Sequence, residues 1–138
     1  LGKIANLFNR DGGPTPPIGI SVPQAMYDDF VEICKPVKNI NPDFPFEVKV
    51  AKPRKRPTST GGTDASVFAV EGVPTYGFTT DDIKGYNFSY GEIWHTERDL
   101  YTKNIPEYQE HTAVVTAIVA LGVANLDKQL SREGMYKE

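Results

Sequence analysis

The sequence predicts an α/β protein in which helices are layered on a sheet. Short runs that are apolar or alternate in polarity, as is typical of strands, alternate along the chain with longer stretches whose apolar residues have helical spacing. The 138 residues are 39% hydrophobic and 24% charged, enough for one domain with a core. We expect only three strands. A sheet that small has exposed edges, which favours a larger sheet whose other strands are not in this sequence.

The first half of the chain is predicted to hold two strands and a helix. Residues 4–8 form a short apolar run that indicates a buried strand, followed by the polar loop 9–13. Residues 12–19 are rich in glycine and proline and are expected to be irregular. Ser21 is the expected N-cap of a helix that continues to about Lys35. Residues 46–50 alternate in polarity, which predicts a half-buried strand.

The second half is predicted to hold two helices and one strand. A helix over residues 64–71 is expected to stop at a glycine, and a strand over 73–78 follows it. Residues 79–93 form a long loop rich in tyrosine and glycine. Pro106 is expected to open the longest helix, which would reach residue 130 with a broad apolar face. The predicted element order is therefore strand, helix, strand, helix, strand, loop, helix, with a polar tail at 131–138.

The composition of the chain limits the classes of function that it can have. The net charge of −3 gives no general attraction to nucleic acid or anionic membranes. The basic run at residues 52–56 is expected to be a solvated loop, and Cys34 is the single cysteine, so no internal disulfide is possible. No stretch is long and apolar enough to span a bilayer, and the N-terminal residues lack a signal-peptide layout. The chain begins without methionine and soon enters an apolar run. This suggests a start inside a larger protein, although processing would look the same.

Two aspartates have a structural and a functional interpretation. Asp11 follows a predicted buried strand, and carboxylates at strand ends in α/β folds point into ligand crevices, where they can bind a divalent cation. Asp-Gly sequences also form ordinary turns, and this segment alone favours a turn. Asp64 precedes an apolar helix, and either Thr63 or Asp64 is expected to cap it, although a helix start can also bind an anion.

His95 is the most informative residue of the segment Trp94-His95-Thr96. A neutral imidazole is the commonest metal ligand and needs an acceptor that fixes its tautomer, which Asp99 or a backbone carbonyl could supply. Taken alone, His95 is interpreted as a hydrogen-bonded loop residue. His111, in the last predicted helix, is interpreted as structural.

Three segments, considered together, favour the functional interpretation of these residues over the structural one. They are "LFNRDGG", "GGTDASVFAVEGVPTYGF" and "WHTERDLYTKNIPEYQEHTAVVTAIVALGVANL". In this order they resemble the C-terminal part of the two-zinc exopeptidases, the aminopeptidases and their carboxypeptidase Q relatives. The resemblance covers nearly the whole chain. It implies that residues 1–138 are the C-terminal portion of one zinc-peptidase catalytic domain, with a three-layer α/β/α fold and a mixed central sheet.

The resemblance also implies roles for particular residues. Asp11 would bind one zinc ion, His95 would bind the other, and Asp64 would order the site. Trp94 stands where some relatives have a tyrosine near the substrate carbonyl, and an indole cannot replace that phenol. Leu100 stands where a threonine is common. Further residues expected near the metals or the substrate pocket are Asp99, Tyr86 and Tyr90.

The other zinc ligands and the general-base glutamate of the family lie upstream of the region that these segments match. The resemblance therefore implies a zinc-dependent metalloaminopeptidase or dipeptidase-like carboxypeptidase that acts on a peptide or dipeptide through metal-bound water. This chain alone would be inactive and would need the N-terminal remainder of its domain. Secretion or a periplasmic location and a homodimer are also expected. The alternatives are a non-catalytic binding or dimerisation module, a glutaminyl-cyclase-like enzyme that uses a single zinc ion, and an unrelated small α/β binding domain.

Overall fold

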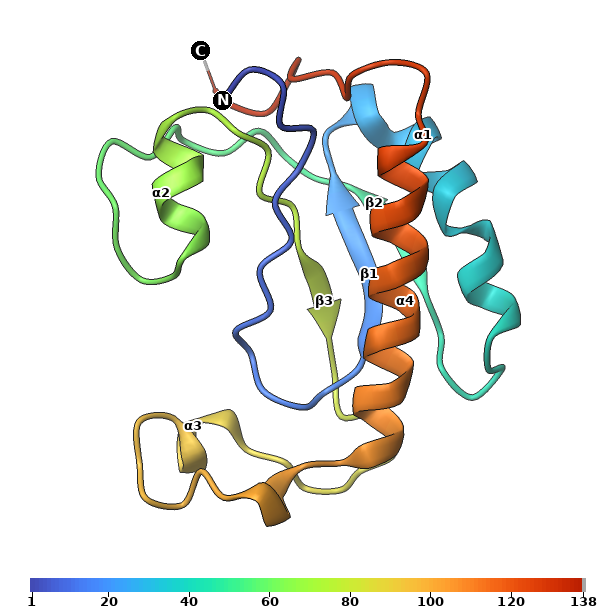
Figure 1. Cartoon of the computed structure of the whole chain (residues 1–138), viewed down its shortest axis with the longest axis vertical. Helices are drawn as coiled ribbons and strands as arrows, with labels where there is room; N and C mark the ends of the chain where they lie inside the picture. Colours follow the sequence, from blue (N-terminus) through green and yellow to red (C-terminus); the bar gives the residue numbers. More distant parts are fainter. Residues whose placement is uncertain (138) are drawn as a thin grey trace.

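The computed structural model describes residues 1–137 and confirms the α/β class (Figure 1). Helices and strands alternate along most of the chain, and the sheet is small and mixed. In order, the elements are β1 (Pro17–Val22), α1 (Gln24–Cys34), a 3₁₀ turn (Lys35–Asn39), β2 (Glu47–Val50), α2 (Ala65–Val70), β3 (Phe78–Thr80), α3 (Tyr90–Ile93), a 3₁₀ turn (Tyr101–Lys103) and α4 (Pro106–Ala124).

The central strand, β1, begins at Pro17, inside the segment 12–19 that was expected to be irregular. It pairs in parallel with β2, with Ile20 opposite Val48, and antiparallel with β3, with Ile20 opposite Phe78. The prediction was wrong because glycine and proline usually interrupt strands. Here Pro17 occupies the first strand position, and at Gly19 a Cβ atom would lie 2.3 Å from the Glu47 carbonyl oxygen. The close approach of β2 therefore requires the glycine inside the strand.

The predicted helix cap at Ser21 was also wrong. Ser21 lies in β1, and α1 starts after Pro23, which makes no side-chain capping bond. Proline is tolerated at this point because the first backbone amides of a helix have no intrahelical partner. The body of the predicted helix is confirmed, with Met26, Phe30 and Cys34 buried along one face.

The predicted strand at residues 4–8 is an extended segment without strand pairing. It lies beside residues 74–76, where the Leu7 amide donates to the Pro74 carbonyl at 2.8 Å. The Asn6 side chain bonds both backbone groups of Tyr76, each at 3.0 Å. One backbone hydrogen bond and one side-chain amide thus attach this segment in place of a regular strand ladder. The strand predicted at 73–78 is displaced toward the C-terminus, because β3 spans Phe78–Thr80 and shares only Phe78 with the prediction.

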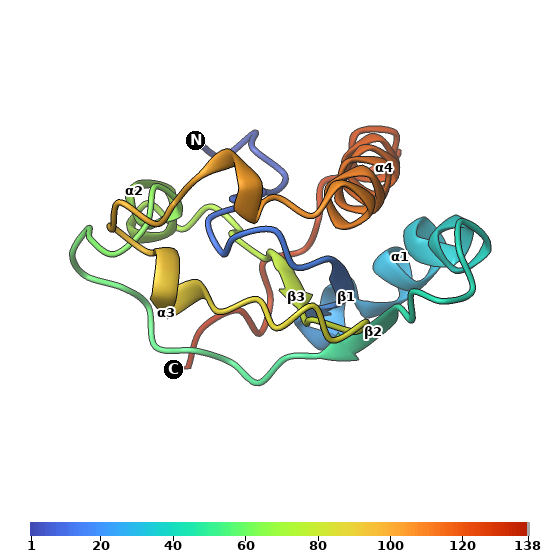
Figure 2. The same cartoon turned by 90° about the horizontal axis from the view of Figure 1, so that it is seen from below.

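Helices α1 and α4 cover one face of the sheet (Figures 1 and 2) and run antiparallel to each other. Gly122 permits this packing, because a Cβ atom there would lie 2.5 Å from Ile33 Cγ2. Along β2 the side chains alternate, so that Val48 packs against the core while Glu47 and Lys49 are exposed. The core between sheet and helices includes Ile20, Val22, Met26, Phe30, Phe46, Val115, Val119 and Val123.

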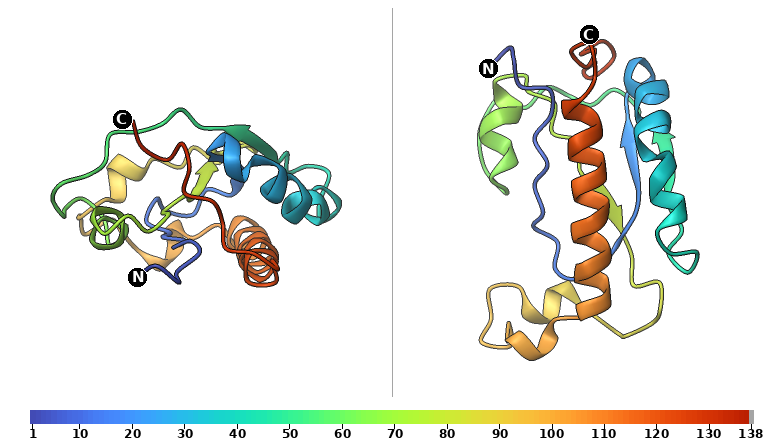
Figure 3. Two further views of the ribbon diagram at one scale, coloured as in Figure 1. Left: turned by 90° about the horizontal axis from the view of Figure 1, so that it is seen from above. Right: turned by 45° about the vertical axis from the view of Figure 1, so that its right-hand side comes forward.

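The last helix starts as predicted at Pro106 but ends at Ala124, earlier than expected. The chain then folds back over the top of α4 (Figure 3). Leu130 and Met135 are buried, and the Arg132 guanidinium donates to the Ile4 carbonyl at 3.2 Å. The predicted polar tail therefore contributes to the core and holds the N-terminal segment. Glu138 lies outside the described residues.

The basic segment was expected to be a solvated loop, and Arg54 departs from that expectation. Its guanidinium carbon lies 5.2 Å from the ring centre of Tyr76 and 5.8 Å from that of Tyr136. It also donates to Thr75 Oγ1 at 2.8 Å, and the backbone of Arg54 pairs with the C-terminal segment. Cation–π contacts and backbone pairing thus attach this segment to the body of the protein.

Candidate functional site

A cleft of about 850 Å³ lies between residues 10–14, residues 90–104 and the first turns of α4. These segments are far apart in sequence. The fold brings them together because residues 4–14 run beside β3 while the chain after β3 turns below them (Figure 1). The predicted site residues that line the cleft are Asp11, Tyr90, Trp94, His95 and Asp99.

The turn that carries Asp11 is held by its neighbours. Arg10 Nη2 donates to the carbonyl oxygens of Gly13 and Thr15 and closes the turn, and burial lowers the pKa of Arg10. Gly13 has φ +79°, and a Cβ atom on it would lie 2.7 Å from Phe88 Cζ. Only glycine suits that conformation and that space. The turn therefore packs against the tyrosine-rich segment, and Asp11 itself stays exposed.

His95 follows the short helix α3 in a left-handed conformation, with φ +55°. Thr96 closes the helix end, because its hydroxyl donates to the carbonyls of Glu92 and Ile93, each at 3.0 Å. The imidazole lies edge-on to Trp94, with ring centres 4.7 Å apart. Positive φ is uncommon outside glycine, although histidine is among the residues that tolerate it. This backbone conformation directs an exposed His95 into the cleft.

Aromatic and apolar side chains form much of the cleft wall. Tyr90 stacks on Trp94 with ring centres 6.4 Å apart, and Trp94 is 58% exposed. Leu100 and Tyr101 continue this wall and are also exposed. Exposed apolar side chains gathered in one concave place are typical of a ligand or partner surface.

Asp64 and Tyr86 lie outside this cleft. Asp64 occupies the cap position of α2 but makes no side-chain capping bond. The neighbouring Thr63 Oγ1 instead accepts from the Ala65 amide at 3.0 Å and from Asn9 Nδ2 at 3.3 Å. Thr63 therefore links the Gly-Gly-Thr-Asp loop to the turn that carries Asp11. Thr63 and Asp64 were the two expected caps of this helix, and Thr63 is the one whose side chain accepts a backbone amide.

A polar network that the sequence analysis missed anchors the segment after β3 to α4. Tyr108 is fully buried, donates to Asp82 Oδ1 at 2.7 Å and accepts from the Lys84 amide at 2.8 Å. Burial, followed by the bond to Asp82, raises the pKa of Tyr108 to about 12. The Tyr108 hydrogen bond lowers the pKa of Asp82, with smaller contributions from backbone amides. The adjacent acidic residues and glycine of "DDIKG" were the available turn signal.

Tyr86 belongs to the same network. Its hydroxyl donates to Glu107, and its ring centre lies 5.3 Å from that of Tyr108. The hydrogen bond to Glu107, followed by burial, raises the pKa of Tyr86. Lys84 Nζ also contacts Glu107, at 2.5 Å. Tyr86 therefore holds the segment in place from outside the cleft.

The cleft residues do not complete a zinc site by themselves. A carboxylate and an imidazole are suitable zinc ligands, but catalytic zinc usually has three protein ligands and structural zinc four. Residues 1–137 contain no group of three or more histidine, cysteine, aspartate or glutamate side chains placed to hold one metal ion. Asp11 and His95 can therefore supply at most part of a metal site.

None of the helices within residues 1–137 combines the length and apolar character that a bilayer crossing requires. No protein-family model matches the sequence, and neither a curated protein nor a solved structure matches it.

Proposed function

We propose that this chain is the C-terminal part of a zinc-dependent exopeptidase, either a metalloaminopeptidase or a dipeptidase-like carboxypeptidase. One observation carries the proposal: Asp11 and His95, which come from distant parts of the sequence, line the same cleft. Their neighbours there include Trp94 and Asp99. Exopeptidase chemistry needs metal ligands and a substrate surface in one concave place, and this cleft has candidates for both.

In this proposal Asp11 and His95 each contribute a ligand to a different zinc ion. Bound zinc would polarise the scissile carbonyl and lower the pKa of a water molecule. The remaining ligands and the general-base glutamate would come from the N-terminal remainder of the domain. Because this chain supplies so few ligands, we expect it to have no peptidase activity alone.

The surface of α4 supports a missing remainder that covers part of this chain. Between Glu110 and Asp127 the sequence has no aspartate, glutamate, lysine or arginine. Val115 and its neighbours face the core, while Val114 is 40% and Leu121 62% exposed on the other side. A helix that is apolar all round is typical of one buried on both faces. We propose that the remainder of the three-layer domain lies against this side. A homodimer and a secreted or periplasmic location rest on the resemblance alone.

The natural gene product, tagged in its own cell and purified, tests this proposal. We expect an intact mass far above 15.3 kDa, bound zinc, and hydrolysis of aminoacyl or dipeptide substrates. Asp11→Asn and His95→Gln should each lower zinc content and abolish hydrolysis. Matched controls are Asp28→Asn, at an exposed position of α1, and His111→Gln, in α4. Both controls should retain zinc.

A second candidate is a non-catalytic binding module, which the incomplete metal ligand set favours. A natural product near 15.3 kDa without zinc would refute the peptidase proposal and support the binding module. A large, zinc-containing product that cyclises N-terminal glutamine without cleaving peptides would instead identify a glutaminyl-cyclase-like enzyme.

A further inference from the structure

Arg10 is an unpaired cation at the wall of the cleft. The cleft has two permanent cations, Arg10 and Lys103. Lys103 Nζ lies 3.3 Å from Glu92 Oε1, so its charge is partly balanced. Arg10 takes part in none of the ion pairs found within residues 1–137. An unpaired guanidinium beside a cavity is a natural binding group for an anion.

The Arg10 guanidinium is held in place before any ligand arrives. Its Nη2 group bonds the carbonyls of Gly13 and Thr15, which fixes the plane of the side chain. The Nη1 group lies near Gly12, and a Cβ atom added to Gly12 would be 3.5 Å from it. The Nη1 and Nε groups have no part in closing the turn. Because the side chain is already ordered, a ligand that uses these donors loses little conformational entropy.

We propose that Arg10 binds the free carboxylate of the ligand that occupies this cleft. The body of the ligand would lie against Trp94, which borders the same space. The inference deepens the proposed function and rests on it in one respect. In a peptidase, the free end of the substrate at Arg10 would be its C-terminal carboxylate, so the enzyme would be a carboxypeptidase or dipeptidase. A substrate held by its N-terminal ammonium would instead need an acidic partner such as Asp99.

Trp94 offers a direct measurement of binding to the chain as it exists. It is the only tryptophan and is 58% exposed at the cleft, so its fluorescence reports occupancy. Three probes share one side chain and differ in charge: N-acetylphenylalanine, N-acetylphenylalaninamide and phenylalaninamide. We expect the acid to bind about tenfold more tightly than the neutral amide, the effect of one charge-assisted hydrogen bond. We expect phenylalaninamide, the cation, to bind most weakly.

Substitutions of Arg10 and Lys103 show which of the two cations causes the tighter binding of the acid. Arg10→Gln should bring the affinities for acid and amide together, and Arg10→Lys should retain part of the difference. Lys103→Gln should leave the difference unchanged. Circular dichroism checks that each variant is folded. Equal affinity of the unaltered chain for acid and amide, tightest binding of phenylalaninamide, or no change in fluorescence with any probe would each overturn the inference.

The result of this binding experiment can be distinguished from the result of the zinc and hydrolysis test of the proposed function. One possible result is a tenfold preference for the acid that depends on Arg10, together with a natural product that has no zinc and no hydrolytic activity. This result would support the carboxylate site and refute the peptidase proposal. A zinc-containing peptidase whose isolated C-terminal chain shows no acid preference would do the opposite.

Discussion

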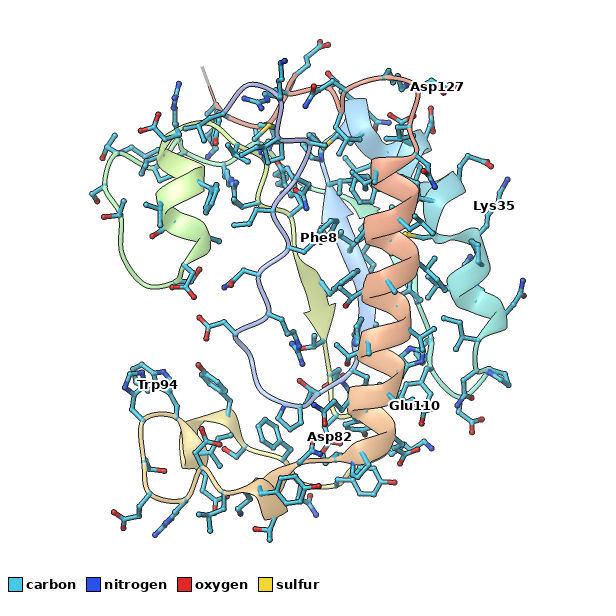
Figure 4. The ribbon with its side chains drawn as sticks, viewed as in Figure 1. Phe8, Lys35, Asp82, Trp94, Glu110 and Asp127 are labelled. Atoms are coloured by element: carbon cyan, nitrogen blue, oxygen red, sulfur yellow. The ribbon has the colours of Figure 1, made fainter. Side chains whose placement is uncertain are left out.

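The segment between β3 and α4 has two halves with opposite character. Residues 81–88 are tied to α4 by Asp82 and Tyr108, whereas residues 94–101 present Trp94 and Tyr101 to solvent. Figure 4 shows Asp82 at the foot of α4 and Trp94 at the far side of the same segment. The difference shows how one long connection can be fixed at one end and open at the other. The anchored half holds the segment, and the open half supplies the cleft wall.

The same physical rules produce both halves. In the anchored half, a buried hydroxyl and a carboxylate satisfy each other and several backbone amides, which stabilises an irregular chain. In the open half, apolar rings remain uncovered, which has a cost in water unless a ligand or partner covers them. We therefore expect substitutions in the anchored half to affect stability and those in the open half to affect binding.

The largest effect is expected at Tyr108. Tyr108→Ala removes a fully buried ring together with its two hydrogen bonds, and such truncations cost about 3–5 kcal/mol of unfolding free energy. Urea denaturation followed by circular dichroism measures the change. Tyr101→Ala is the matched control in the open half, where the ring is 92% exposed, and it should change stability by less than about 0.5 kcal/mol. Equal losses at the two positions would contradict the comparison.

Asp82 should make the anchored half sensitive to acid. Its pKa is lowered from 3.8, first by the Tyr108 hydrogen bond, so the folded chain binds protons less readily than the unfolded chain. This contribution to stability is present above pH 3.8 and is lost as pH falls through the lower folded value. Asp82→Asn should lower stability at neutral pH and flatten the acid limb of a stability–pH curve. A variant with the unaltered curve would show that Asp82 does not anchor the segment.

His111 should add a dependence in a higher pH range. It packs on Phe44 with ring centres 4.2 Å apart, and its buried Nε2 atom has no hydrogen-bond partner within residues 1–137. Burial lowers its pKa from 6.5, so its contribution to stability is present above pH 6.5 and is lost as pH falls toward the folded pKa. His111→Leu should remove this slope while the acid limb due to Asp82 remains. A persistent slope between pH 6.5 and the acid limb would assign it to another group.

The smallest effect is expected at the two left-handed residues other than glycine, one in each half. Asn87 has φ +58° and His95 has φ +55°. Glycine adopts this conformation without strain, so Asn87→Gly and His95→Gly should each stabilise the chain or leave it unchanged, by less than about 1 kcal/mol. Only His95→Gly should reduce zinc binding in the natural product. Equal loss of zinc in both variants would show that the loss does not come from removing the imidazole of His95.

Much of the fold could be predicted because its signals are local. The alternation at residues 46–50 predicted β2, the apolar run after Gly-Gly-Thr-Asp predicted α2, and Pro106 predicted the start of α4. The resemblance named Asp11 and His95, and both line the cleft. Nothing in the spacing of Asp82 and Tyr108 predicted their contact, because each residue has an ordinary local environment in the sequence.

By itself the sequence determined where α2 lies and where α4 begins, which residues are apolar, and which residue types could bind a metal or an anion. These depend on the backbone and on neighbours a few positions away. Only the tertiary structure decided that Pro17–Val22 is the central strand, that Asn6 pairs with Tyr76, and that Met135 is buried. Hydrogen-bond partners and burial are set by segments distant in the chain, and local preference is overridden when such contacts stabilise more than the preference costs.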